Sequence, residues 1–232
     1  MNLIKQILCG SSLFCLSSLL FALPIKSLVL HYDEEESGAG VQTMRYIIND
    51  QFLRIDSGDA ASDFILFDRD KTTVYSINHE DRTILKIINK PWQSPEYDFP
   101  VFVEEHTLMD APKVFGKQTF SYQVKAQDKA CTKVLLVKDV HMDSMQVLYE
   151  FQNVMSGQQV ATLDNTPKEF HTPCFLVDQV FHKADYFKLG LPIQLSHSRD
   201  YSKFLQDIKE EKMDAELFIL PEKYEEFLPF VQ

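Results

Sequence analysis

Short apolar segments separated by polar turns dominate residues 41–88. The polar clusters recur about every ten residues, at 49–50, 57–59, 68–70 and 79–81. Alternation is clearest where Thr73, Tyr75 and Ile77 share one side of their segment. A period of two with regular turns is typical of strands, and connections this short leave no room for parallel crossovers. The pattern predicts an antiparallel meander with strands at 43–47, 52–55, 64–67, 73–77 and 83–87.

Further strands are predicted on both sides of this meander, at 28–32, 117–125, 130–138, 146–153 and 193–198. Pro100 confines another strand, at 99–103, to a sheet edge, because proline cannot donate a ladder hydrogen bond. Residues 201–212 fit either a helix or a bent strand, and 217–220 predict a last short strand that Pro221 stops.

The clearest helical pattern lies between Thr172 and Gly190. Thr172 can cap the amino end with Pro173 in the first turn, and Gly190 suits the left-handed position after the last turn. Between them, apolar residues recur every three or four positions and form one stripe. We therefore predict an α+β, mainly β fold: a curved antiparallel sheet, or half-barrel, of about nine or more strands covered by one long helix. No domain boundary is visible, so residues 23–232 are expected to form a single domain.

Residues 1–22 have the pattern of a secretory signal peptide. Lys5 gives a positive start, residues 7–21 are apolar and uncharged, and Ala22 precedes a break at Pro24. Cleavage after Ala22 is the first prediction. Cleavage after Ser27 and retention as an anchor helix are the alternatives. The expected location is the periplasm or the extracellular space, with no stable membrane span once the leader is cleaved.

Charge and cysteine usage narrow the class of protein. The chain has 34 acidic and 23 basic residues, and a net charge of −11 argues against nucleic acid as a partner. Cys9 and Cys15 lie in the predicted leader, which leaves Cys131 and Cys174. Two cysteines in an oxidising compartment most simply form a disulfide, and two free buried thiols are the alternative. Neither cysteine lies in a CxxC pair, so a redox-catalytic role has little support.

The sequence contains no motif of a known catalytic or cofactor site. GxSxG, GxGxxG, Walker, HExxH and EF-hand patterns are all missing, and the seven histidines are scattered singly. We therefore expect no cofactor and no metal. A small exported hydrolase with His79, His106 or His141 in a cleft is a third-ranked hypothesis, and the sequence names no nucleophile for it.

Phenylalanine is the unusual feature of the composition, with 18 residues. Six of them could line an apolar cavity inside a curved sheet: Phe52, Phe64, Phe67, Phe120, Phe151 and Phe181. The alternative is simple core filling, because a sheet covered by a helix needs many large apolar side chains.

Three segments resemble an uncharacterised family of exported bacterial proteins: residues 44–56, residues 64–79 and the closing Phe-x-x-Pro-x-x-Tyr pattern at 218–224. That family is similar in architecture to LolA/LolB-type lipoprotein carriers, in which a curved antiparallel sheet capped by helices surrounds an apolar cavity. The chain departs from the family at Phe120, near which a cysteine is common, and has Cys131 later instead. The family pattern supplies no catalytic residue.

The resemblance and the abundance of phenylalanine together predict the function. We expect a cell-envelope protein with a LolA-like domain that binds or carries a hydrophobic ligand, such as an acyl chain or a lipoprotein. The alternative is a protein–protein interaction module of the envelope with no small ligand, whose contact surface is an exposed sheet edge.

Overall fold

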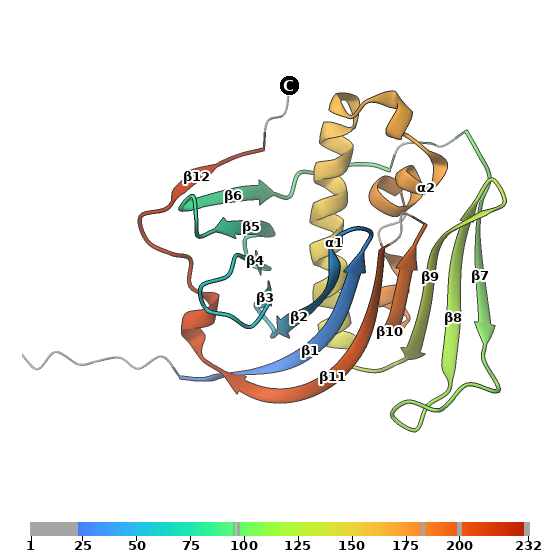
Figure 1. The fold of residues 1–232 in the computed structure, drawn as a ribbon, viewed down its shortest axis with the longest axis horizontal. Coiled ribbons are helices and arrows are strands. Elements are labelled where there is room, and N and C mark those ends of the chain that lie inside the picture. The colour runs from blue at the N-terminus through green and yellow to red at the C-terminus, as the bar shows by residue number, and fades with distance from the viewer. Residues whose placement is uncertain (1–22, 95, 97, 182–183, 199–200, 230–232) are drawn as a thin grey trace, which may run out of the picture.

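A computed structural model describes residues 23–94, 96, 98–181, 184–198 and 201–229. Within these ranges, twelve strands form one curved sheet that does not close, and one long helix, α1 (Met142–Thr162), lies against its concave side (Figure 1). The strands are β1 (Ile25–Glu36), β2 (Gly40–Ile48), β3 (Phe52–Asp56), β4 (Phe64–Asp68), β5 (Thr73–Asn78), β6 (Thr83–Ile88), β7 (Val101–Thr107), β8 (Thr119–Ala126), β9 (Lys129–Lys138), β10 (Gly190–His197), β11 (Tyr201–Met213) and β12 (Glu225–Phe227).

The order of the strands explains how distant parts of the chain meet. It runs β12-β6-β5-β4-β3-β2-β1-β11-β10-β9-β8-β7, so the predicted meander is confirmed as β2 to β6. Neighbours pair antiparallel except β12, which runs parallel to β6. β1 pairs with β11 along its whole length, from Ile25 opposite Met213 to Glu36 opposite Tyr201. The predicted fold class is therefore confirmed, and residues 201–212 are a strand.

The position of the long helix was predicted wrongly. Residues 146–153, expected as a strand, lie inside α1. A short apolar run does not by itself distinguish a strand from a buried helix. Here the helix buries Met145, Leu148 and Val154 against the sheet. Met145 and Leu148 are three positions apart, and Leu148 and Val154 are six apart. Arg69 fixes the same helix to the turn after β4 with two hydrogen bonds to Glu150, of 2.6 and 2.9 Å.

The helix expected between Thr172 and Gly190 is interrupted. Thr172 does cap the amino end and accepts a hydrogen bond from the Phe175 amide, but the α-helix α2 covers only Pro173–Leu176. A π-helical turn, Val177–Phe181, follows. Ala184 has a left-handed conformation with φ of 51° and precedes a separate 3₁₀ turn, Asp185–Lys188. Gly190 is the first residue of β10 rather than a helix end. A Cβ at this position would lie 2.0 Å from the Val137 carbonyl oxygen, so the close approach to β9 requires glycine.

Two other predictions need correction or lie outside the described residues. Residues 217–220 do not form a strand, because a 3₁₀ turn covers Ala215–Phe218 and the last strand is β12. The predicted leader, 1–22, lies outside the described residues. Cleavage after Ser27 would remove three residues of β1 that pair with β11. Within the described ranges, no helix combines the length and the apolarity that are needed to cross a bilayer.

The predicted disulfide is confirmed. Cys131 on β9 and Cys174 on α2 are bonded, with their Cα atoms 4.9 Å apart. Both residues are buried. The bond ties the segment after α1 to the concave face of the sheet.

Each face of the sheet has its own hydrophobic core. Successive side chains of a strand point to opposite faces. Leu28 and Leu30 of β1 therefore pack with α1 on the concave side, whereas Val29 packs on the other side. The outer core is completed by the segment after β11, which contributes Phe218. The space between α1 and the sheet is where the two layers leave a cavity.

Candidate functional site

The β10–β11 hairpin carries an unusual group of side chains toward α1. Leu195 pairs with Lys203 and His197 pairs with Tyr201 across the two strands, so alternation places all four on the concave face. Together with Leu148, Phe151, Phe187, Tyr46, Tyr186 and Gln152 they line a hollow of about 150 Å³, which we name the concave cavity. One wall of this cavity is apolar, and the other carries hydroxyl, imidazole and ammonium groups.

Lys203 is the most unusual residue of the cavity. It is only 8% exposed, and its Nζ lies 4.8 Å and 5.0 Å from the ring centroids of Tyr32 and Tyr46. Among the residues that the structure describes, its ammonium makes no hydrogen bond and no ion pair. Burial lowers the pKa of Lys203, and the charge of Glu34 partly opposes this effect. A buried cation without an anionic partner is costly, so it marks a functional site or a site of strain.

The acid that faces Lys203 is already engaged. Glu34 on β1 lies directly opposite Lys203 in the β1–β11 register. Its Oε1 accepts a hydrogen bond of 2.6 Å from the Tyr46 hydroxyl. Burial raises the pKa of both Tyr46 and Tyr201, and the carboxylate of Glu34 adds to the effect, so both phenols stay protonated donors. Glu34 is therefore held by tyrosine and not by the lysine.

A second polar group borders an adjoining cavity of about 130 Å³, which shares Gln152, Tyr186 and His197 with the concave cavity. The Asp178 side chain is fully buried, and its Oδ1 accepts a hydrogen bond from the Thr132 hydroxyl. Its Oδ2 lies 3.4 Å from His197 Nδ1. Asp178 and Thr132 hold the imidazole of His197 in place beside Tyr201. The two rings stack, with their centroids 5.7 Å apart.

This arrangement differs from a serine-hydrolase triad. In such a triad the hydroxyl and the carboxylate contact opposite nitrogens of the imidazole, so that a proton can pass through the ring. Here both the Thr132 hydroxyl, at 3.1 Å, and the Asp178 carboxylate lie next to Nδ1 of His197. The group can orient the imidazole and offer polar contacts to a ligand, but it does not place the Thr132 hydroxyl as a nucleophile activated by the other ring nitrogen.

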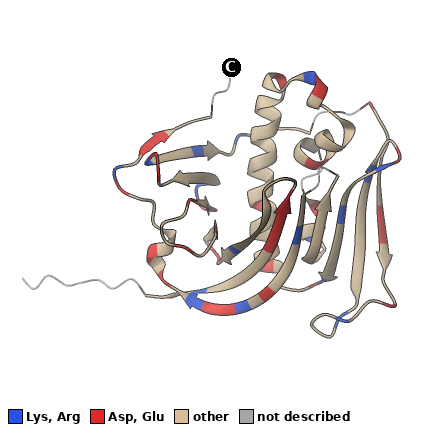
Figure 2. Ribbon diagram, in the orientation of Figure 1, with Lys and Arg blue, Asp and Glu red and all other residues tan. Residues whose placement is uncertain are grey.

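The polar end of the concave cavity reaches the surface. A third hollow, of about 390 Å³, shares His197 and Tyr201 with it and is lined by the exposed residues Glu35 and Ser37. Figure 2 shows an acidic stretch at this end of β1, which contains Asp33, Glu34, Glu35 and Glu36.

The phenylalanines singled out from the sequence lie on two different faces of the sheet. Those that pack into or against the concave core are Phe67, Phe120 and Phe151. Phe52 and Phe64 belong to the outer core. The side chain of Phe181 lies outside the described part of the structure. Phe67 and Phe151 contact each other, with ring centroids 6.1 Å apart, and Phe151 lines the concave cavity.

The three histidines of the hydrolase hypothesis are far apart in the fold. His79 follows β5, and its Nδ1 lies 2.8 Å from the Tyr224 hydroxyl. The His106 side chain is 66% exposed on β7 and lies 3.9 Å from Glu104. His141 precedes α1 in a left-handed conformation, with φ of 48°. The structure therefore does not combine these histidines into one site.

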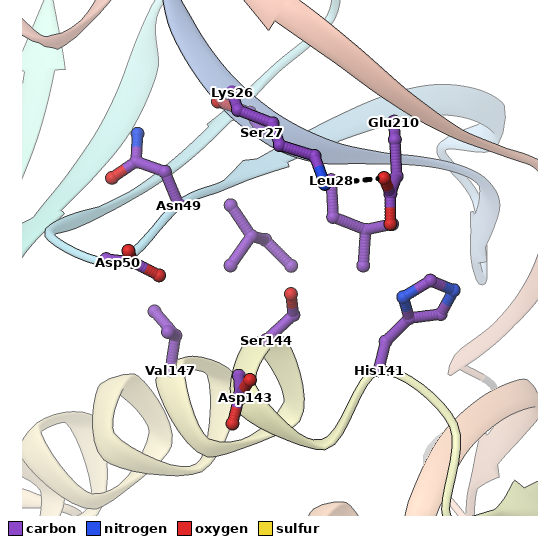
Figure 3. Close-up of a pocket in the computed structure, with 11 residues that line it drawn as sticks. Lys26, Ser27, Leu28, Asn49, Asp50, His141, Asp143, Ser144, Val147 and Glu210 are labelled. Carbon is purple, nitrogen blue, oxygen red and sulfur yellow. Dashed lines mark ion pairs between the residues drawn. The ribbon is translucent and has the colours of Figure 1, made fainter.

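Another hollow, of about 200 Å³, lies between the first turn of α1 and strands β1 and β2 (Figure 3). Lys26 and Glu210 form a 2.8 Å ion pair at its rim, and both side chains are more than half exposed. Asn49 uses its Oδ1 to accept hydrogen bonds from the backbone amides of Gln51 and Phe52, which fixes the turn between β2 and β3. The contacts around this hollow are explained by turn and rim structure, so it is the weaker candidate for a ligand site.

Lys203, His197 and Asp178 were not predicted as site residues. One signal was available in the order Tyr201, Lys203 and Leu205, because residues two apart in a strand share a face. A strand assignment for 201–212 would have placed a lysine among apolar side chains. Asp178 had no comparable signal, since its partners Thr132 and His197 come from two separate strands.

In the described part of the chain, no group of three or more His, Cys, Asp and Glu side chains could hold a metal ion. No family model matches this chain, and no curated protein matches it either. Two solved structures of PNGF-II, in space groups C2 and P21, are similar to it with a TM-score of 0.41 and 11% identity, over 88% of this chain and 31% of the other. The chain thus spans about a third of that protein's length.

Proposed function

We propose that this protein binds a hydrophobic or amphipathic ligand, such as an acyl chain, in the concave cavity between the sheet and α1. The observation that carries the proposal is the composition of that cavity. Leu148, Phe151, Phe187 and Leu195 form an apolar wall, and tyrosine, glutamine, histidine and lysine side chains form the rest of the lining. Small-molecule sites combine apolar side chains with convergent polar groups, and the large polar share here favours an amphipathic ligand.

The size of the cavity limits the ligand. A dry cavity of about 150 Å³ is large enough for benzene. The concave cavity is of this size, so it suits a short acyl chain or the end of a longer one. The similarity of three sequence segments to the family with LolA/LolB-like architecture supports the same kind of ligand.

We also propose that the protein acts outside the cytosol. The leader-like pattern of residues 1–22 supports this proposal. So does the buried disulfide between Cys131 and Cys174, since structural disulfides persist in oxidising compartments and are rare in the cytosol.

A ligand series with a cavity-filling variant tests the binding proposal. Straight-chain alcohols of four to ten carbons are titrated against the purified protein, with thermal stabilisation and NMR shifts as readouts. Wild type should be stabilised most by one chain length. Leu195→Trp, which fills the cavity, should abolish the effect, whereas Phe204→Trp on the neighbouring strand should keep it because Phe204 is 38% exposed. If no member of the series stabilises the wild type, the proposal is wrong.

The edge strand β7 favours a second candidate, a protein–protein interaction module. β7 is the last strand of the sheet, and its Phe102 and Val103 are 52% and 48% exposed. An exposed edge with apolar side chains can accept a strand from a partner. Pull-down from envelope extracts tests this candidate: a stoichiometric protein that binds wild type and is lost with Phe102→Glu would favour it over ligand binding.

A further inference from the structure

The charged groups around the concave cavity are unequally satisfied. Glu34 is half-buried and accepts from Tyr46, whereas Asp178 is buried and accepts from Thr132 through Oδ1. Asp178 Oδ2 lies 3.4 Å from His197 Nδ1 and makes no hydrogen bond within the described residues. The Lys203 ammonium contacts the faces of two tyrosine rings, which stabilise a cation. Glu34 adds a favourable charge, but within the described residues it forms no ion pair with Lys203. A negatively charged acceptor is therefore the group that would best complement the Lys203 ammonium.

We propose that the ligand is a small amphipathic carboxylic acid, and that Lys203 binds its carboxylate while its apolar tail lies against Leu148, Phe151 and Leu195. This inference rests on the binding function proposed above and specifies its ligand class. Lys203 and Leu195 are cross-strand neighbours, so the ammonium and the apolar wall meet directly at this pair. A carboxylate at Lys203 thus places the attached chain against apolar side chains and not in solvent.

Two further features favour a carboxylate in this position. Gln152 and Tyr186 also line the cavity, and amide and hydroxyl groups can donate to a carboxylate oxygen. A hydrogen-bonded ion pair also offsets the penalty of burying the Lys203 ammonium, because the ligand supplies an opposite charge at hydrogen-bond distance. Glu34 is the acid that opposes such a ligand, since it faces Lys203 across the β1–β11 pair.

The test compares ligands that differ in charge and not in length. Hexanoate and 1-hexanol are titrated against wild type, Lys203→Met and Lys209→Met, with NMR shifts and calorimetry as readouts. Lys209 is a matched control, because it is on the same strand with its side chain 52% exposed. Wild type and Lys209→Met should bind hexanoate at least about tenfold tighter than hexanol, as expected for a charged hydrogen bond of about 1.5–3 kcal/mol. Lys203→Met should lose this preference and keep its affinity for hexanol.

A second variant tests the opposing charge. Glu34→Gln removes the acid that faces Lys203 and leaves an amide oxygen that can still accept from Tyr46. This variant should bind hexanoate severalfold tighter than wild type and hexanol equally well. This variant tests the interaction between the ligand carboxylate and Lys203 without altering the lysine.

The outcomes separate this inference from the proposed function. If wild type binds hexanoate and hexanol equally, or if Lys203→Met keeps the preference for hexanoate, the carboxylate assignment is overturned while the binding function stands. If neither ligand binds wild type, the proposed function fails together with it. The comparison of the two ligands on wild type decides the question even if a variant does not fold.

Discussion

The disulfide between Cys131 and Cys174 should provide a large part of the stability of this fold. The two residues are 43 positions apart in the sequence, so the bond closes a long loop that contains all of α1. In the chain-entropy model, closing a loop of this length stabilises the folded state by about 4 kcal/mol. For a protein of this size, that corresponds to a decrease of roughly 8–16 °C in Tm when the bond is removed.

The double variant Cys131→Ala/Cys174→Ala is the direct perturbation. Its free energy of unfolding is compared with that of oxidised wild type by urea denaturation, and its Tm by calorimetry. Both cysteines are buried, so lost side-chain contacts add to the entropic term. Wild type reduced with a thiol reagent is the control, because it lacks the bond and keeps both sulfur atoms. A loss below about 1 kcal/mol in both samples would refute the chain-entropy reasoning.

The bond should also protect the candidate site. Cys131 precedes Thr132 on β9, and Cys174 lies one turn before Asp178. Reduction should therefore speed amide hydrogen exchange at residues 173–180 more than in the β2–β6 meander. Uniform acceleration over the whole chain would contradict this local effect.

Two other predictions concern residues outside the cavity. Asp56→Asn should cost about 3–5 kcal/mol at neutral pH, because the buried carboxylate pairs with Arg45 at 2.8 Å and Arg54 at 2.5 Å. Burial alone would raise the pKa of Asp56, but the hydrogen bonds from the two arginines outweigh it and hold this pKa below its ordinary value. This stability is present above the unfolded pKa of about 3.9 and is lost as the pH falls through the folded pKa. In urea denaturation, the free energies of unfolding of the variant and of wild type should therefore converge below about pH 4. A constant difference down to strongly acidic pH would contradict the assignment. Gly190→Ala should cost about 1–3 kcal/mol, since a Cβ would lie 2.0 Å from the Val137 carbonyl oxygen, and an unchanged denaturation midpoint would show that β10 and β9 can separate at no cost.

The parts of the fold that were predictable depend on local pattern. In the meander, each strand is specified by its own alternation and by the turn residues beside it, so β2 to β6 follow from the sequence. α1 was missed because the apolar and aromatic residues within 146–153 (Val147, Leu148, Tyr149 and Phe151) fit a short strand as well as a helix. Only the sheet provides the surface that the helix covers. The helix expected at 172–190 has a correct cap at Thr172, but its α-helical part ends at Leu176 and changes to a π-helical turn, which no local rule predicts.

The candidate site was less predictable than the fold. Of the predicted cavity phenylalanines, Phe151 lines the concave cavity, and Phe52 and Phe64 lie in the outer core, because a strand sends alternate side chains to opposite faces. Lys203 and Asp178 appear as ordinary charged residues in the sequence. Their burial is decided by neighbours that are distant along the chain, such as Tyr32 and Thr132.

The sequence by itself determined the strand-rich character of the chain, the hairpins of the meander and the two cysteines that were available to pair, since each of these depends on residues close together or on simple counting. Only the tertiary structure decided that β1 and β11 lie side by side, that α1 covers the concave face, and that Lys203 is buried there against two tyrosine rings. The physical reason is that burial and charge pairing depend on the distance between side chains in space, which the order of residues does not specify.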